Sequence, residues 1–273
     1  MENLDTQNLV LGKSTRYYED YSPSLLQPIS RSLGRASLSQ KEFFGYDLWR
    51  IYELCYLNAN GIPQVAWGYI RVNAKSEFIV ESKSLKLYLG SFTMTKFADL
   101  AEVEAIIQHD LTNVLHNDVC VKLFDLEICA FPISSVNGIL IDKEITLEKV
   151  DYTYNPQLLK CDLNQNVEET LSSNILRTLC PVTSQPDHAT VFINYKGPKI
   201  DRQALFAYLC SLRHHQGFHE QCAEMIYSDI LMNLKPQELT VTACFTRRGG
   251  IDINPVRTNL KEIPCHIARC YRQ

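Results

Sequence analysis

Residues 47–72, DLWRIYELCYL-NANGIP-QVAWGYIRV, give the clearest structural signal in the chain. Apolar and polar residues alternate in both outer runs, as they do on strands with one buried face. The segment between them, NANGIP, carries the Asn, Gly and Pro that are typical of a turn. This stretch therefore predicts an antiparallel hairpin with strands at 47–57 and 64–72.

The residues after the hairpin predict a short strand, two helices and a closing strand. FIVES at 78–82 is extended in pattern, and SLKLYLGSF at 84–92 is helical. DLAEVEAIIQHDLTNVLH at 99–116 has apolar residues at helical spacing, and Asp99 is suited to cap that helix. VCVKLFDLEI at 119–128 returns to the pattern of a strand.

The second half repeats this order of elements. HATVFINYKG at 188–197 predicts a strand that ends in a turn, and ELTVTACFTRR at 238–248 predicts a strand before a Gly-Gly turn. Helices are expected at 201–214, with Asp201 as cap, and at 218–234. For NVEETLSSNILRTLC at 166–180, an extended segment and a helical turn both stay open.

The repeated order predicts an internally duplicated α+β chain. We expect four segments, which are an N-terminal arm at 1–45, a first module at 46–141, a connection at 142–166 and a second module at 167–273.

Composition excludes several classes of protein. A net charge of −4 over 273 residues provides no basic surface for nucleic acid. No apolar run approaches the roughly 18 residues of a membrane span, and no signal peptide is visible, so we expect a cytoplasmic protein. The ten cysteines are scattered without a CxxC pair, and CHIARC at 265–270 offers too few ligands for zinc.

The first candidate site is ESKSLKLYLGSF at 81–92. Its simplest interpretation is a capped helix with lysines on the solvated face. Lys83 and Lys86 share one helix face, however, and with the neighbouring serines they could hold a phosphate at the helix N-terminus. Glu81 could accept hydrogen bonds from a ring N–H or an amino group.

Two further candidates lie in the second half. RHHQGFHEQC at 213–222 is either a helix–helix junction or a pocket entrance at which His219 and Glu220 contact a ligand. Its three histidines do not match a metal-binding motif. TRRGGIDINPVR at 246–257 is either a surface turn or a phosphate clamp of arginines and flexible glycines. Neither a Rossmann motif nor a P-loop occurs in the chain.

The last candidate is TLCPVTSQPDHATVFINY at 178–195. Two prolines restrict the backbone between Cys180 and Asp187. A thiol needs help to ionise at neutral pH, and a nearby carboxyl group could take its proton and pass it to a substrate. Local sequence does not decide whether this pair is catalytic or belongs to an ordinary turn.

Taken together, these stretches resemble the QueF family of NADPH-dependent 7-cyano-7-deazaguanine reductases. ESKSLKLY matches the family signature at every position, CPVTSQPD looks like the catalytic segment, FHEQC like the start of the substrate-binding helix, and TRRGGIDINP like the second cofactor loop. The resemblance runs from GKSTRYY near residue 12 to Arg257 and is that of the long, two-module branch. Ser184 stands at a variable position and leaves the catalytic pair intact.

The resemblance implies tandem tunnelling-fold modules like those of GTP cyclohydrolase I, with antiparallel sheets backed by paired helices. It implies reduction of 7-cyano-7-deazaguanine by two NADPH, a step toward queuosine in tRNA, with a free base rather than tRNA as the partner. Cys180 would form a thioimide with the nitrile, and Asp187 would donate the proton. The residues implied in binding are Val80, Glu81, Ser82, His219 and Glu220 for the substrate, and Ser82, Lys83, Arg248 and Gly249 for NADPH.

Two other functions stay open at this point. A zinc-dependent pterin or purine hydrolase of the same fold would need metal ligands, whereas the resemblance implies no metal. An inactive deazapurine-binding module would not need Cys180, Asp187 and both cofactor stretches together. We further expect a homodimer, because two modules in each chain need fewer chains to close a barrel.

Overall fold

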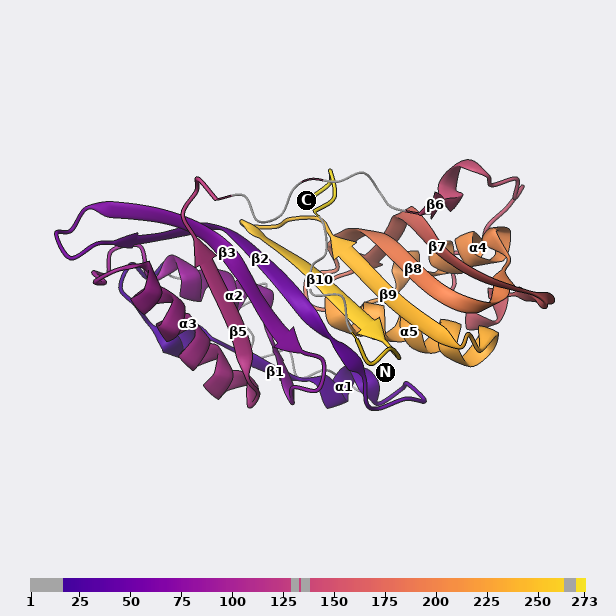
Figure 1. Ribbon diagram of the computed structural model, residues 1–273, viewed down its shortest axis with the longest axis horizontal. Helices are drawn as coiled ribbons and strands as arrows, with labels where there is room; N and C mark the ends of the chain where they lie inside the picture. The colour runs from indigo at the N-terminus through magenta and orange to yellow at the C-terminus, as the bar shows by residue number, and fades with distance from the viewer. Residues whose placement is uncertain (1–16, 129–132, 134–137, 263–268) are drawn as a thin grey trace. The chain divides into compact units, whose positions relative to one another are not determined.

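The computed structural model describes residues 17–128, 133, 138–262 and 269–273. Its contacts divide the chain into two compact units. Unit 1 comprises residues 1–34, 46–130 and 247–252, and unit 2 comprises residues 35–45, 131–246 and 253–273. Each unit combines antiparallel strands with helices, so the chain is α+β as predicted (Figure 1). Within the described ranges, no helix is long and apolar enough to cross a membrane.

Unit 1 is built on the predicted hairpin. β2 (Phe44–Leu57) pairs antiparallel with β3 (Pro63–Asn73), and β3 pairs with β5 (Val119–Phe124). β1 (Pro28–Ser30) and β4 (Phe78–Val80) form a separate two-stranded sheet. β5 is shorter than predicted, because the chain turns after it and the Trp67 indole N–H donates to the carbonyl oxygens of Asp125 and Ile128.

Two helices complete unit 1. α2 (Ser82–Gly90) and α3 (Leu100–Leu115) confirm the predicted pair, and the Asp99 carboxylate caps α3 by accepting from the Glu102 N–H at 2.9 Å. α3 contacts β4 and β5, and it buries one apolar face. The predicted irregular segment also holds the short elements η1 (Pro23–Leu25) and α1 (Arg31–Arg35).

Unit 2 is a mostly antiparallel sheet in the order β10-β9-β8-β7-β6. Its antiparallel strands are β7 (Cys161–Leu179), β8 (Pro186–Ile200), β9 (Glu238–Phe245) and β10 (Ile251–Thr258), and β6 (Ile139–Leu140) lies parallel to β7. The helices are α4 (Arg202–Ser211) and α5 (His219–Leu234), with 3-10 turns η2 (Ile141–Lys143), η3 (Pro156–Leu158) and η4 (Leu212–His214). β7 covers residues 166–179 of the stretch that sequence left open, so this stretch is strand up to the residue before Cys180.

The predicted turn after Tyr195 is wrong. β8 continues through Gly197, which pairs with Val167 of β7, and ends at Ile200. Glycine is required at position 197 because the backbone of Pro236 approaches closely there, and a Cβ on residue 197 would lie 2.8 Å from the Pro236 Cα.

The two units repeat a polar cluster as well as an order of elements. A Tyr-x-Pro-x-Leu-Leu segment starts at Tyr21 in unit 1 and at Tyr154 in unit 2, and each forms a 3-10 turn. Asp110 of α3 accepts hydrogen bonds from Tyr21 and from Tyr88 of α2, at 2.6 and 2.7 Å. Asp229 of α5 accepts equivalently from Tyr154 and from Tyr208 of α4. This repeat supports an internal duplication.

Candidate active site

The predicted site residues fall into two groups. Cys180, Asp187, His219 and Glu220 belong to unit 2, and the others belong to unit 1. The unit 1 group consists of Val80, Glu81, Ser82, Lys83, Arg248 and Gly249.

Cys180 follows the last residue of β7, in a tight loop that leads into β8. Its N–H donates to the Gln185 carbonyl oxygen at 2.9 Å, and its own carbonyl oxygen accepts from the Ser184 N–H at 3.0 Å. Ser184 has a φ of 56°, a left-handed conformation that tightens the loop. Only 9% of the Cys180 surface is exposed. The loop therefore holds the thiol in a defined and largely buried position.

Asp187 lies on the facing strand of the same hairpin. It pairs with Thr178, and Cys180 follows β7 two residues after Thr178, so the Cys180 loop and Asp187 lie at the same end of the hairpin. Asp187 is 5% exposed. The hairpin thus brings Cys180 and Asp187 to the same end of strands β7 and β8.

Backbone hydrogen bonds join the segment just before α5 to this hairpin. The Leu179 N–H donates to the His215 carbonyl oxygen at 2.8 Å, and the Gly217 N–H donates to the Leu179 carbonyl oxygen at 3.1 Å. As a result, the His219 Nε2 lies 3.5 Å from the Asp187 Oδ2. The His219 ring also packs on Phe245, with centroids 4.0 Å apart. No local pattern pointed to Phe245, the last residue of β9.

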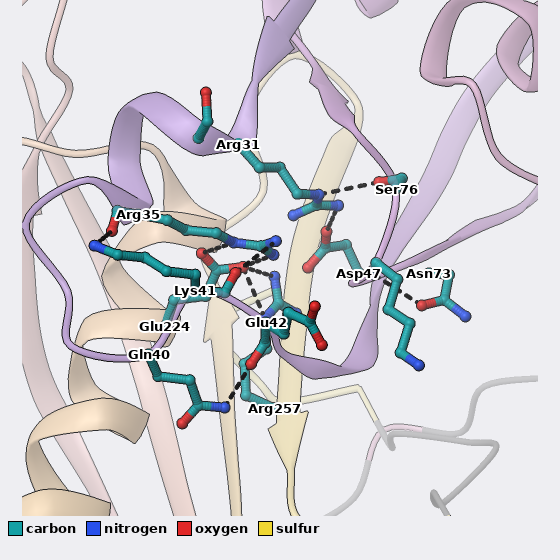
Figure 2. A network of polar contacts seen from close by, with 12 residues as sticks. Arg31, Arg35, Gln40, Lys41, Glu42, Asp47, Asn73, Ser76, Glu224 and Arg257 are labelled. Atoms are coloured by element: carbon teal, nitrogen blue, oxygen red, sulfur yellow. Dashed lines mark hydrogen bonds and ion pairs between the residues drawn. The ribbon is translucent and has the colours of Figure 1, made fainter.

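A buried ionic cluster fixes α5 further along the helix. Glu224, one turn beyond Glu220, accepts from the Arg35 Nη2 at 2.6 Å and from the Arg257 Nη2 at 2.9 Å (Figure 2). All three side chains are at most a tenth exposed. Because two guanidinium groups bind the same carboxylate, they restrict the rotation of α5. Glu220 lies on the first turn of this helix and is 3% exposed.

Other cysteine and histidine side chains near the hairpin have a packing role. Cys222 is fully buried, and this burial, with the nearby Asp187 and Glu220 carboxylates, raises the pKa of its thiol to about 12. Burial lowers the pKa of His215 and favours its neutral form. Within the described ranges, no three His, Cys, Asp or Glu side chains form a metal-binding group. Residues 12–16 of GKSTRYY and residues 265–268 of CHIARC lie outside those ranges.

In unit 1, Glu81 is fully buried between β4 and α2. Its carboxylate caps α2 by accepting from the N–H groups of Lys83 and Ser84, both at 2.8 Å. Burial raises the pKa of Glu81, although these hydrogen bonds act in the opposite direction. The capping interpretation is thus confirmed. A carboxylate has about four acceptor positions, so capping leaves room for a ligand N–H. Val80 ends β4 and is 3% exposed.

The Arg248–Ile251 turn meets α2 within unit 1. Its two ends exchange backbone hydrogen bonds of 2.9 and 3.1 Å, and φ is 56° at Gly249 and 79° at Gly250, the values of a type I′ turn. A Cβ on Gly249 would lie 2.7 Å from the Lys86 Nζ, so that lysine packs against the turn. Lys86 of α2 therefore lies beside the turn that carries Arg248 and Gly249.

The chain is similar to known nitrile reductases over most of its length. Residues 17–123 match a family described as the N-terminal part of nitrile reductase, 7-cyano-7-deazaguanine-reductase, and residues 186–263 match a family of QueF-like proteins. Over 256 residues, the chain is 47% identical to the NADPH-dependent 7-cyano-7-deazaguanine reductase of Saccharophagus degradans. That alignment covers 92% of this chain and 94% of the relative.

Proposed function

This chain belongs to the family of NADPH-dependent 7-cyano-7-deazaguanine reductases, and we propose that it performs the family's reaction through a thioimide on Cys180. This assignment rests on one observation, which is that the Cys180 loop, Asp187 and the start of α5 lie together in unit 2. The His219 Nε2 lies 3.5 Å from the Asp187 Oδ2, and Cys180 follows β7 at the end of the hairpin where Asp187 lies.

In the first step the Cys180 Sγ adds to the nitrile carbon. The thiol proton passes to the Asp187 carboxylate and then to the nitrile nitrogen, as one C–N π bond breaks and the C–S bond forms. His219 holds the Asp187 carboxyl group in place for both transfers. Because Asp187 and Cys180 are largely buried, water has little access to an imine, which would otherwise hydrolyse.

Recognition of the deazaguanine base requires acceptors for its N–H groups. Glu81 is suited to this role, since its buried carboxylate is already oriented by the backbone of α2. We assign the Val80 and Ser82 backbone, His219 and Glu220 to the same substrate. A carboxylate that accepts from two adjacent N–H groups distinguishes guanine-type bases from those that lack such donors.

The cofactor binds through its phosphates in this proposal. Ser82 and Lys83 at the start of α2, together with Arg248 and Gly249, supply backbone N–H groups and cations for them. When bound, NADPH would supply a hydride in each of two successive reductions. The C–S bond breaks between them and returns the Cys180 thiolate, and with two protons the four electrons convert the nitrile to the aminomethyl group.

The wider organisation is part of the same proposal. We propose that residues 46–141 and 167–273 are tandem tunnelling-fold modules, that the chain forms a homodimer in the cytoplasm, and that its substrate is the free base and not tRNA. The duplicated Tyr–Asp–Tyr clusters support the tandem arrangement.

The test combines turnover with adduct formation. Purified protein with 7-cyano-7-deazaguanine should oxidise two NADPH per nitrile, measured as loss of the nicotinamide absorbance. Without NADPH, mass spectrometry should detect a covalent adduct in the wild type and in Cys222→Ala, but not in Cys180→Ala. Binding without oxidation would indicate an inactive binding module, and stoichiometric zinc would favour a hydrolase.

A further inference from the structure

Tyr52 lies in a β-bulge of β2, inside unit 1. Ile51 pairs with Gly68 and Leu54 pairs with Ala66, so Tyr52 and Glu53 together face the single residue Trp67. A bulge of this kind interrupts the regular pairing and redirects the side chains of its residues. The Tyr52 backbone and side chain are thereby available to a neighbour other than β3.

That neighbour is the 247–252 loop. The Tyr52 N–H donates to the Gly250 carbonyl oxygen at 2.9 Å, and the Tyr52 hydroxyl donates to the Asp252 Oδ2 at 2.6 Å. The Arg247 guanidinium lies over the Tyr52 ring, 4.6 Å from its centroid. One residue therefore contacts the loop before, within and after its type I′ turn.

Asp252, which accepts the hydrogen bond from the Tyr52 hydroxyl, is itself held in place by its neighbours. Asp252 is fully buried, and the equally buried Arg50 guanidinium lies 3.2 Å from its Oδ1. On the other side of the turn, a Cβ on Gly250 would lie 2.6 Å from the Glu53 Oε2, so Glu53 packs closely against the loop. The loop is consequently held to the bulge on both sides, while Arg247 and Arg248 stay exposed.

We propose that Tyr52 is a positioning residue for the cofactor loop and that it sets the affinity for NADPH. This inference rests on the proposed function, in which Arg248 and Gly249 contact the cofactor. Long cationic side chains lose conformational freedom when they bind phosphate, and a loop that is already ordered reduces that loss. The aromatic ring orients Arg247 in the same way, toward the same anionic ligand.

The experiment compares Tyr52→Phe and Tyr52→Leu with Tyr56→Phe. Tyr56 lies four residues along the same strand, is 5% exposed, and packs its ring against Phe97 away from the loop. We expect Tyr52→Phe to raise the KM for NADPH about tenfold, since it loses a hydrogen bond to a charged group. Tyr52→Leu should add a further factor of about three through loss of the cation–π contact.

Adduct formation separates positioning from general structural damage, because capture of the nitrile by Cys180 needs no NADPH. We expect the adduct, the KM for the nitrile and kcat at saturating NADPH to stay within about twofold of the wild type in Tyr52→Phe, and every parameter to do so in Tyr56→Phe. An unchanged KM for NADPH in Tyr52→Phe would overturn the inference. Loss of the adduct in Tyr52→Phe would also overturn it, since Tyr52 would then act on the whole fold.

Failure of the proposed function has a different signature. In that case the wild type itself neither forms the adduct nor oxidises NADPH. Direct NADPH titration by nicotinamide fluorescence then still decides the inference, because weaker binding by Tyr52→Phe than by Tyr56→Phe supports it and equal binding overturns it.

Discussion

Replacement of Glu224 by Gln tests whether the ionic cluster on α5 stabilises unit 2. Glu224 is 1% exposed and accepts from Arg35 at 2.6 and 3.0 Å and from Arg257 at 2.9 and 3.1 Å (Figure 2). Glutamine preserves the volume and one acceptor oxygen. It removes the negative charge, however, and places an N–H₂ group where a carboxylate oxygen accepted from the Arg35 guanidinium.

The expected loss follows from the burial of the three groups. Removing one partner of a buried ion pair destabilises a protein by about 3–5 kcal/mol, because the remaining charge is left uncompensated. Arg257 is fully buried and Arg35 is 8% exposed, so water cannot readily solvate either guanidinium. For a chain of this size, the loss corresponds to a decrease in Tm of about 6–20 °C.

Urea unfolding measures this loss directly, and Glu168→Gln is the matched control. Glu168 also lies in unit 2, but its side chain is 74% exposed and 3.7 Å from Lys196. We expect the control to change the free energy of unfolding by less than about 0.5 kcal/mol. If Glu224→Gln loses less than about 1 kcal/mol, the cluster does not hold α5 and our account of how Glu220 is positioned is wrong.

Three further predictions concern single residues. Burial raises the pKa of Glu81 above its ordinary 4.5, so the KM for the nitrile should rise as the pH falls toward that pKa, and Glu81→Gln should remove this dependence in steady-state assays. The Cys222 thiol keeps its proton up to about pH 12 when folded, but it ionises near 9.0 when unfolded. Its contribution to the free energy of unfolding is therefore complete below pH 9 and falls by about 1.4 kcal/mol per pH unit between pH 9 and about 12. In urea titrations, the stability of Cys222→Ala should fall less steeply with pH over this range than that of the wild type. Gly45→Ala should cost more than about 3 kcal/mol by thermal unfolding, because its Cβ would lie against the Val256 carbonyl oxygen. Gly61→Ala should cost about 1 kcal/mol, because φ is also positive there but the Cβ would meet only the flexible end of the Lys96 side chain, at 3.4 Å.

Local pattern was sufficient for most elements of the fold. Apolar periodicity predicted the β2–β3 hairpin and the helices α2, α3, α4 and α5. The caps at Asp99 and Asp201 could also be predicted, because a cap depends only on residues a few positions away. The same reasoning failed at Gly197, where glycine marks close approach to Pro236 and not a turn.

The repeated Tyr-x-Pro-x-Leu-Leu segments were also missed. Their tyrosines are meaningful only through Asp110 and Asp229, which lie 89 and 75 residues further along the chain. A short polar motif of this kind carries no periodicity, so it gives no signal until its partner is known.

For the active site, sequence determined which chemical groups are present, and tertiary structure decided which of them meet. Cys180, Asp187 and the ESKSLKLY signature pointed to a nitrile reductase through their resemblance to the QueF family, whereas local spacing left the pair undecided. The contact between Asp187 and His219 and the three contacts of Tyr52 depend on strand register and on a bulge. Tyr52 and Asp252 are 200 residues apart, and only the paired strands bring that hydroxyl to that carboxylate.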